Sequence, residues 1–151
     1  MTTTRLALLL LQGFQVAFLL LHDWIPLGRL TNRKAIAEAD SLSHRVWTTA
    51  ISGLPFAIGF AFSLRAGAGP FAGWLRIWLW ASYALLFAGE LRAWWLPYFV
   101  WNEPARAERY RARFAGTLRF LPERRSMAPD ALHTVLHVTT AATLALLALD
   151  R

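Results

Sequence analysis

The chain lacks cysteine and contains a single lysine, Lys34, and the first absence excludes several kinds of chemistry. Without cysteine there is no disulfide, no thiol nucleophile and no thiolate ligand for a metal. Acidic residues are also few, 9 against 16 basic ones, so the net charge is +7 and is carried almost entirely by arginine. These arginines cluster in two loops between apolar runs, so membrane topology explains them better than nucleic-acid binding. No nucleic-acid partner is therefore expected.

Hydrophobic residues make up 56% of the chain, above the roughly 45–50% of a soluble domain. They are concentrated in four runs at about 5–27, 44–64, 71–100 and 131–149. Each run reaches the roughly 20 residues that a helix needs to cross a bilayer. The first run is not expected to be a cleaved signal peptide, because His22 and Asp23 stand where small residues would mark the cleavage site. The pattern predicts an all-α, polytopic membrane protein of one domain, 1–151, with four transmembrane helices in an antiparallel bundle.

The basic residues predict the orientation of these helices. The loops 28–43 and 101–130, with Arg45 beside the first, carry eleven of them, whereas the opposite side carries only Arg5, Arg65 and Arg151. Cytoplasmic loops are enriched in arginine and lysine. We therefore predict a multi-pass protein of a bacterial cytoplasmic membrane, with both loops in the cytoplasm and both termini outside it.

The second basic loop carries a helical pattern of its own. Apolar side chains recur every three or four residues, with arginines between them, at Ala107, Tyr110, Phe114 and Leu118. This spacing predicts an amphipathic helix that lies in the plane of the cytoplasmic membrane surface. The alternative is a helix packed on the protein's own loops. Side-chain caps are expected from Ser41 or Ser43, Asn102 and Asp130, which precede the second run, the loop helix and the fourth run.

The most unusual stretch is Gly89–Trp95, which places Glu90 and Arg92 near the end of the third apolar run. Charged groups inside a membrane are costly and normally face the protein interior or water. The predicted topology brings other titratable residues to the same depth, and the complete inner-leaflet layer is His22, Asp23, His44, Glu90, Arg92, His133 and His137. Arg92 is two residues from Glu90 and so points away from it on a helix. We therefore expect Glu90 to find its partner on another helix, at His137 or His22.

Four roles are open for this layer. A divalent metal would be bound by His133, His137 and Glu90, with Asp23 or His22 completing the ligand set. Haem b would be held between His137 and either His22 or His44. Alternatively, four arginines would bind an anionic lipid head group, with a histidine available as a general base if the lipid is also modified: Arg92, Arg106, Arg109 and Arg113. The fourth role is a purely structural network between helices.

Three segments carry a family resemblance: His22–Gly28, Gly89–Trp95, and Pro129–His137. They resemble those of a family of small bacterial integral membrane proteins with four helices and no assigned activity. The resemblance implies the membrane fold but assigns no role to any residue. We expect a binding or accessory protein built around the polar layer, whose partners are membrane lipids and either another membrane protein or a second copy of the chain. Whether it is an enzyme stays open.

Overall fold

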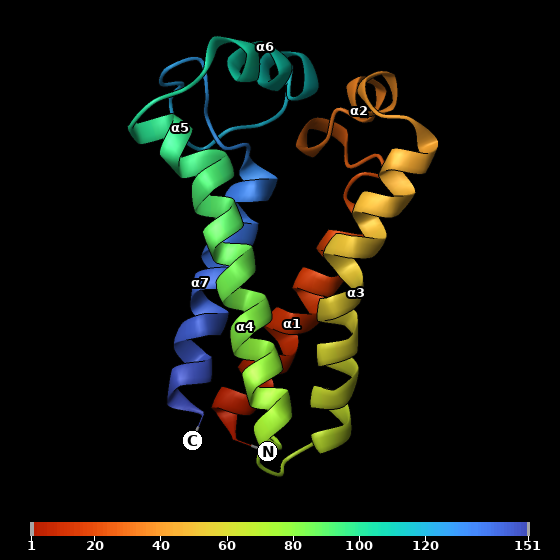
Figure 1. Cartoon of the computed structure of the whole chain (residues 1–151), viewed down its shortest axis with the longest axis vertical. Coiled ribbons are helices and arrows are strands. Elements are labelled where there is room, and N and C mark those ends of the chain that lie inside the picture. The colour runs from red at the N-terminus through yellow and green to blue at the C-terminus, as the bar shows by residue number, and fades with distance from the viewer. Residues whose placement is uncertain (1, 151) are drawn as a thin grey trace.

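The computed structural model describes residues 2–150, and every regular element within them is a helix. Four long helices follow the long axis of the molecule (Figure 1): α1 (Thr3–Leu21), α3 (Leu42–Ala66), α4 (Gly73–Glu90) and α7 (Ala131–Leu149). Of these, α1, α3 and α7 are long and apolar enough to cross a membrane. The fourth, α4, carries Arg76 and Glu90, which lower its hydropathy. The all-helical class and the membrane-compatible character of three predicted spans are thus confirmed.

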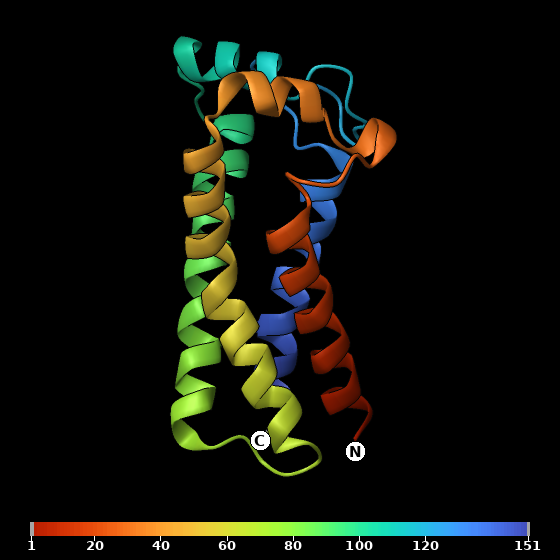
Figure 2. The same cartoon turned by 90° about the vertical axis from the view of Figure 1, so that its right-hand side faces the viewer.

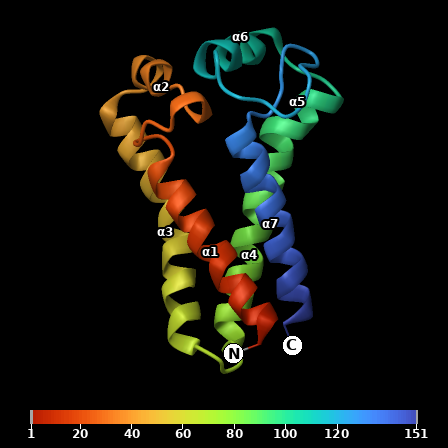
Figure 3. The same cartoon turned by 180° about the vertical axis from the view of Figure 1, so that it is seen from behind.

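The four long helices pack in a closed ring. α1 contacts α3 and α7, and α4 contacts the same two helices from the other side (Figures 2 and 3). The N- and C-terminal ends of the described chain lie at the same end of the molecule. There Arg5 of α1 forms an ion pair with Asp150, with 2.9 Å between Nη2 and Oδ2. This pair neutralises one of the basic charges at that end, and another, Arg151, lies outside the described residues.

The distribution of apolar side chains is that of a membrane protein. The ring encloses a core that includes Leu8, Leu79 and Tyr83, all nearly inaccessible. Large apolar side chains such as Ile51 and Leu85 point outward and are more than two-thirds exposed. Exposed aliphatic surface on this scale is unfavourable in water but is what lipid-facing helices present.

Helix ends at the basic end depart from the predicted boundaries. α1 stops at Leu21, so His22 and Asp23 follow the helix, and the chain then passes through η1 (Gly28–Leu30) and α2 (Arg33–Ala39). α3 begins at Leu42 because the side chain of Ser41 accepts a hydrogen bond from the backbone N–H of His44. That cap is one of the two that the sequence allowed.

The third apolar run does not continue as one α-helix. α4 ends at Glu90, and a π-helical turn, η2 (Leu91–Trp95), and the short α5 (Leu96–Phe99) follow. Pro97 explains the break, because its ring would collide with the carbonyl four residues earlier and it has no N–H to donate. The wider turn, in which Leu96 N–H bonds to the carbonyl of Leu91, accommodates it. Such π turns often mark functional sites.

The helix predicted in the second basic loop exists but is shorter, as α6 (Pro104–Arg113). The predicted cap at Asn102 is wrong, because that side chain instead donates to the carbonyl of Arg125 at 2.9 Å. α6 lies across the end of the long helices, beside α2 (Figure 1). Its apolar side chains Ala107 and Tyr110 are buried against the protein, which agrees with a helix packed on the protein's own loops, and the in-plane position stays a prediction.

Candidate functional site

A cavity of about 700 Å³ opens at the basic end, between the ends of α1 and α7 and the segments η2 and α6. Four arginine side chains line it, and they are the four that the sequence nominated for an anionic ligand: Arg92, Arg106, Arg109 and Arg113. We call it the arginine cavity. The structure thus brings together side chains from η2 and α6, although the two segments are separated by α5 and a loop.

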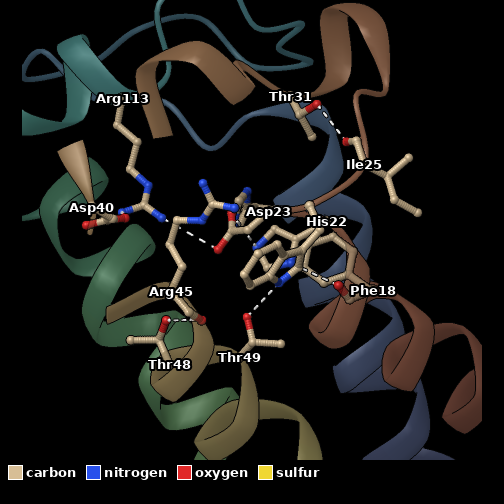
Figure 4. A network of polar contacts seen from close by, with 12 residues as sticks. Phe18, His22, Asp23, Ile25, Thr31, Asp40, Arg45, Thr48, Thr49 and Arg113 are labelled. Carbon is tan, nitrogen blue, oxygen red and sulfur yellow. Dashed lines mark hydrogen bonds and ion pairs between the residues drawn. The ribbon is translucent and has the colours of Figure 1, made fainter. Parts of the chain in front are cut away.

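Only one of the four arginines is neutralised by carboxylates. Arg113 bridges Asp40 and Asp23, with Nη1–Oδ2 and Nη2–Oδ2 distances of 2.7 and 3.6 Å (Figure 4). Among residues 2–150, no carboxylate lies within 4 Å of the guanidinium groups of the other three arginines. The cavity therefore has three uncompensated positive charges and only one acidic side chain, Asp23, in its wall.

His133 lies in the first turn of α7 and lines the cavity. Its backbone N–H donates to Oδ1 of Asp130 at 2.8 Å, so Asp130 is the predicted N-cap of α7. Both carboxylate oxygens also lie 3.0 Å from Nδ1 of the His133 ring. Burial alone would raise the pKa of Asp130, but the hydrogen bonds from His133 outweigh it and hold the pKa below its usual range. Asp130 is therefore charged at neutral pH and orients the imidazole.

His22 and Asp23 complete the wall on the α1 side. Nδ1 of His22 lies 2.8 Å from the carbonyl of Phe18, and Nε2 lies 3.3 Å from Oδ1 of Asp23. The His22 and His133 rings meet edge to face, 5.6 Å between centroids. His22, Asp23 and His133 therefore meet, as the sequence predicted. Trp94 packs on the His133 ring at 4.4 Å.

The other predicted members of the layer do not reach the cavity. His44 is exposed on α3, 3.8 Å from Asp40. Glu90 is buried in the helix ring, and its Oε1 accepts a hydrogen bond from Oγ1 of Thr140 at 2.9 Å. The expected partners His137 and His22 are therefore wrong. Thr140 lies three residues after His137 on the same face of α7, about one helical turn further along. The relative depth of α4 and α7 therefore decides which of the two side chains meets Glu90.

Neither cofactor hypothesis gains support. Within residues 2–150, no three histidine or acidic side chains are placed to share one metal ion. Of the predicted ligands, His133 turns Nδ1 to Asp130 and Glu90 bonds to Thr140. The predicted haem ligand His137 is 3% exposed and packs against the rings of Trp94 and Trp95. A flat macrocycle could not reach this imidazole without displacing them.

Two contributors to the site were not recognised as such from the sequence. Tyr110 of α6 donates its hydroxyl to the carbonyl of Ala128, tying the arginine-bearing helix to the segment before α7. Burial raises the pKa of Tyr110 to about 12, so it remains a donor. Asp130 was expected only as a cap. The sequence contains a signal for the additional contact to His133, because a carboxylate at a helix cap and a side chain three residues later are placed to pair.

No family model, curated protein or solved structure matches this chain. The resemblance to a family of small bacterial membrane proteins accordingly stays a prediction. The function of the arginine cavity has to be inferred from its own geometry and charge.

Proposed function

We propose that this protein crosses a bacterial cytoplasmic membrane four times and binds a phosphate monoester in the arginine cavity, either a phosphorylated lipid head group or a soluble ester. The observation that carries the proposal is the group of three arginines without carboxylate partners, Arg92, Arg106 and Arg109, around one cavity of about 700 Å³. A cavity of this size accommodates a small-molecule ligand.

The four crossings are supported by the position of α4 in the helix ring. α4 packs between α3 and α7 and follows the same axis (Figure 2), so a bilayer that contains those two helices also contains α4. Near the end with the termini, Arg76 is placed to extend its guanidinium toward the head groups. The basic end is assigned to the cytoplasm by the arginine count. A reporter enzyme fused after the C-terminus should be active only outside the cytoplasm.

The charge of the cavity favours phosphate over a neutral or singly charged ligand. Three guanidinium groups that remain unpaired in a partly enclosed site repel one another and lose hydration. A phosphate monoester has about 1.5–2 negative charges at neutral pH, and its oxygens match the paired N–H groups of a guanidinium. A zwitterionic head group such as choline phosphate offers little net charge to compensate them.

Binding can be measured on the purified protein in detergent by native mass spectrometry. Phosphatidic acid, phosphatidylcholine and glycerol 3-phosphate serve as the probes. We expect phosphatidic acid or glycerol 3-phosphate to bind with much higher affinity than phosphatidylcholine, because only the first two carry a phosphate monoester. The member of the pair that binds more tightly identifies the ligand as lipid or soluble.

The double variant Arg92→Gln with Arg109→Gln should weaken binding at least tenfold, since each charge-assisted hydrogen bond is worth about 1.5–3 kcal/mol. The matched control is Arg111→Gln. Arg111 lies on α6 like Arg109 but lines a different, smaller cavity of about 360 Å³. Equal losses in the double variant and the control, or equal binding of phosphatidic acid and phosphatidylcholine, would contradict the proposal.

A further inference from the structure

We infer that the arginine cavity also hydrolyses the phosphate monoester that it binds, with His133 as the general base and Asp130 as the residue that positions it. This inference rests on the proposed function, since the arginines must first hold the phosphate. It adds a reaction, and it is carried by a different observation, the geometry of the His133–Asp130 pair.

The contacts of Asp130 determine which nitrogen of His133 is reactive. A carboxylate only accepts hydrogen bonds, so Nδ1 of His133, 3.0 Å from both of its oxygens, carries the proton. The lone pair of the neutral imidazole is then on Nε2. Among residues 2–150 no hydrogen bond to Nε2 is present, and His133 lines the cavity. This nitrogen is free to accept a proton from a water molecule there.

The pair is also held rigidly, as a general base requires. Asp130 is 2% exposed and is tied down by the N–H of His133. The His133 ring packs on Trp94 and meets Phe114 edge to face at 5.5 Å. A helix cap alone needs only the backbone hydrogen bond to Asp130. The additional contact to the imidazole fixes a base in the wall of the cavity that the three arginines also line, an arrangement that helix capping does not require.

The reaction is the attack of water on phosphorus. Nε2 of His133 takes a proton from the water as its oxygen bonds to phosphorus, and the bond between phosphorus and the alcohol oxygen breaks. Arg92, Arg106 and Arg109 stabilise the negative charge on the other phosphate oxygens. The departing alkoxide takes a proton from solvent, and His133 returns its own proton to solvent. One water is consumed for each alcohol and each inorganic phosphate released.

The test is a phosphate-release assay on the purified protein in mixed micelles, with phosphatidic acid and glycerol 3-phosphate as alternative substrates. We expect release from at least one of them and none from phosphatidylcholine. In water enriched in oxygen-18, each released phosphate should carry one labelled oxygen. Turnover of the lipid alone identifies a head-group phosphatase, and turnover of the soluble ester alone identifies a small-molecule phosphatase.

His133→Asn should lower turnover by about 10²–10⁴, the usual contribution of a general base, while monoester binding through the arginines is retained. Asp130→Asn preserves the helix cap, because asparagine caps as well as aspartate. It should reduce kcat with little change in KM, because the imidazole loses the carboxylate that orients it while the arginines still bind the phosphate. Arg111→Gln should remain fully active.

The outcomes separate the two proposals. Bound monoester without phosphate release overturns hydrolysis and leaves the binding function in place, whereas release that survives His133→Asn overturns the role of His133 as the general base. Absence of monoester binding in the native protein overturns both. Asp130→Asn that keeps full turnover overturns the positioning role.

Discussion

Replacing Asp130 separates its role as a helix cap from its role as a charged partner of His133. Alanine removes both, whereas asparagine keeps a cap oxygen for the backbone N–H of His133, now 2.8 Å from Oδ1. An N-cap contributes about 1 kcal/mol, and a hydrogen bond to a charged group contributes about 1.5–3 kcal/mol. We therefore expect the free energy of unfolding to decrease by about 2.5–4 kcal/mol in Asp130→Ala and by about 1.5–3 kcal/mol in Asp130→Asn.

The pH dependence of this difference has a definite sign. The pKa of Asp130 in the folded protein lies below its ordinary value of 3.8. The charged carboxylate therefore stabilises the fold fully above pH 3.8, and this contribution is lost as the pH falls through the lower, folded-state pKa. The difference in unfolding free energy between the native protein and Asp130→Asn should therefore narrow in that acidic range. The difference between the asparagine and alanine variants should stay constant, because neither side chain titrates.

Thermal unfolding in detergent, repeated between neutral pH and about pH 3, provides the measurement. The melting temperature should decrease from the native protein to the asparagine variant and then to the alanine variant. If Asp130→Asn is as destabilising as Asp130→Ala at neutral pH, asparagine does not preserve the helix cap. If the gap between the native protein and Asp130→Asn is independent of pH, the charge of Asp130 does not stabilise α7.

The same unfolding assay tests substitutions at Thr140, Gly53 and Gly89, and the native mass spectrometry assay of monoester binding tests one at Arg113. Thr140→Val removes the hydrogen-bond donor of the buried Glu90 and should cost about 1–3 kcal/mol, the penalty for an unpaired buried polar group; no loss would mean that water replaces it. Gly53→Ala places a methyl group 2.4 Å from a side chain of α1 and should cost about 1 kcal/mol, whereas Gly89→Ala meets nothing within 4 Å and should be neutral or stabilising. Arg113→Gln frees Asp23 in the cavity wall, and Asp40 outside it, from their ion pairs and should weaken monoester binding, because their negative charge then opposes the ligand; unchanged binding would refute this electrostatic role.

Much of the fold could be predicted because it depends on local chemistry. Apolar runs of about 20 residues predict the long helices, and the caps at Ser41 and Asp130 follow from side chains that accept backbone N–H groups. The meeting of His22 and His133 also followed from the sequence. Each lies at the basic end of its run, so helix length and direction alone bring them to one level.

Other features depend on how the helices are rotated and spaced. Helix length places Glu90 near both His137 and Thr140, and only the packing of α4 on α7 selects Thr140. His44 lies in the first turn of α3 but is exposed and pairs with Asp40, so it does not reach the cavity. The π turn at Leu91–Trp95 alters the direction of the following side chains, which the spacing of an α-helix does not anticipate.

By itself, the sequence determined the helical class, the segments suited to lipid and the end at which the arginines gather. These properties follow from hydrophobic length and charge, which are summed along the chain. Only the tertiary structure decided that Arg92 and the arginines of α6 surround one cavity, and that His133 faces it with Asp130 behind. That outcome depends on η2 and α6 folding over the ends of α1 and α7. Contacts between segments distant in the chain set that arrangement, and no local pattern encodes it.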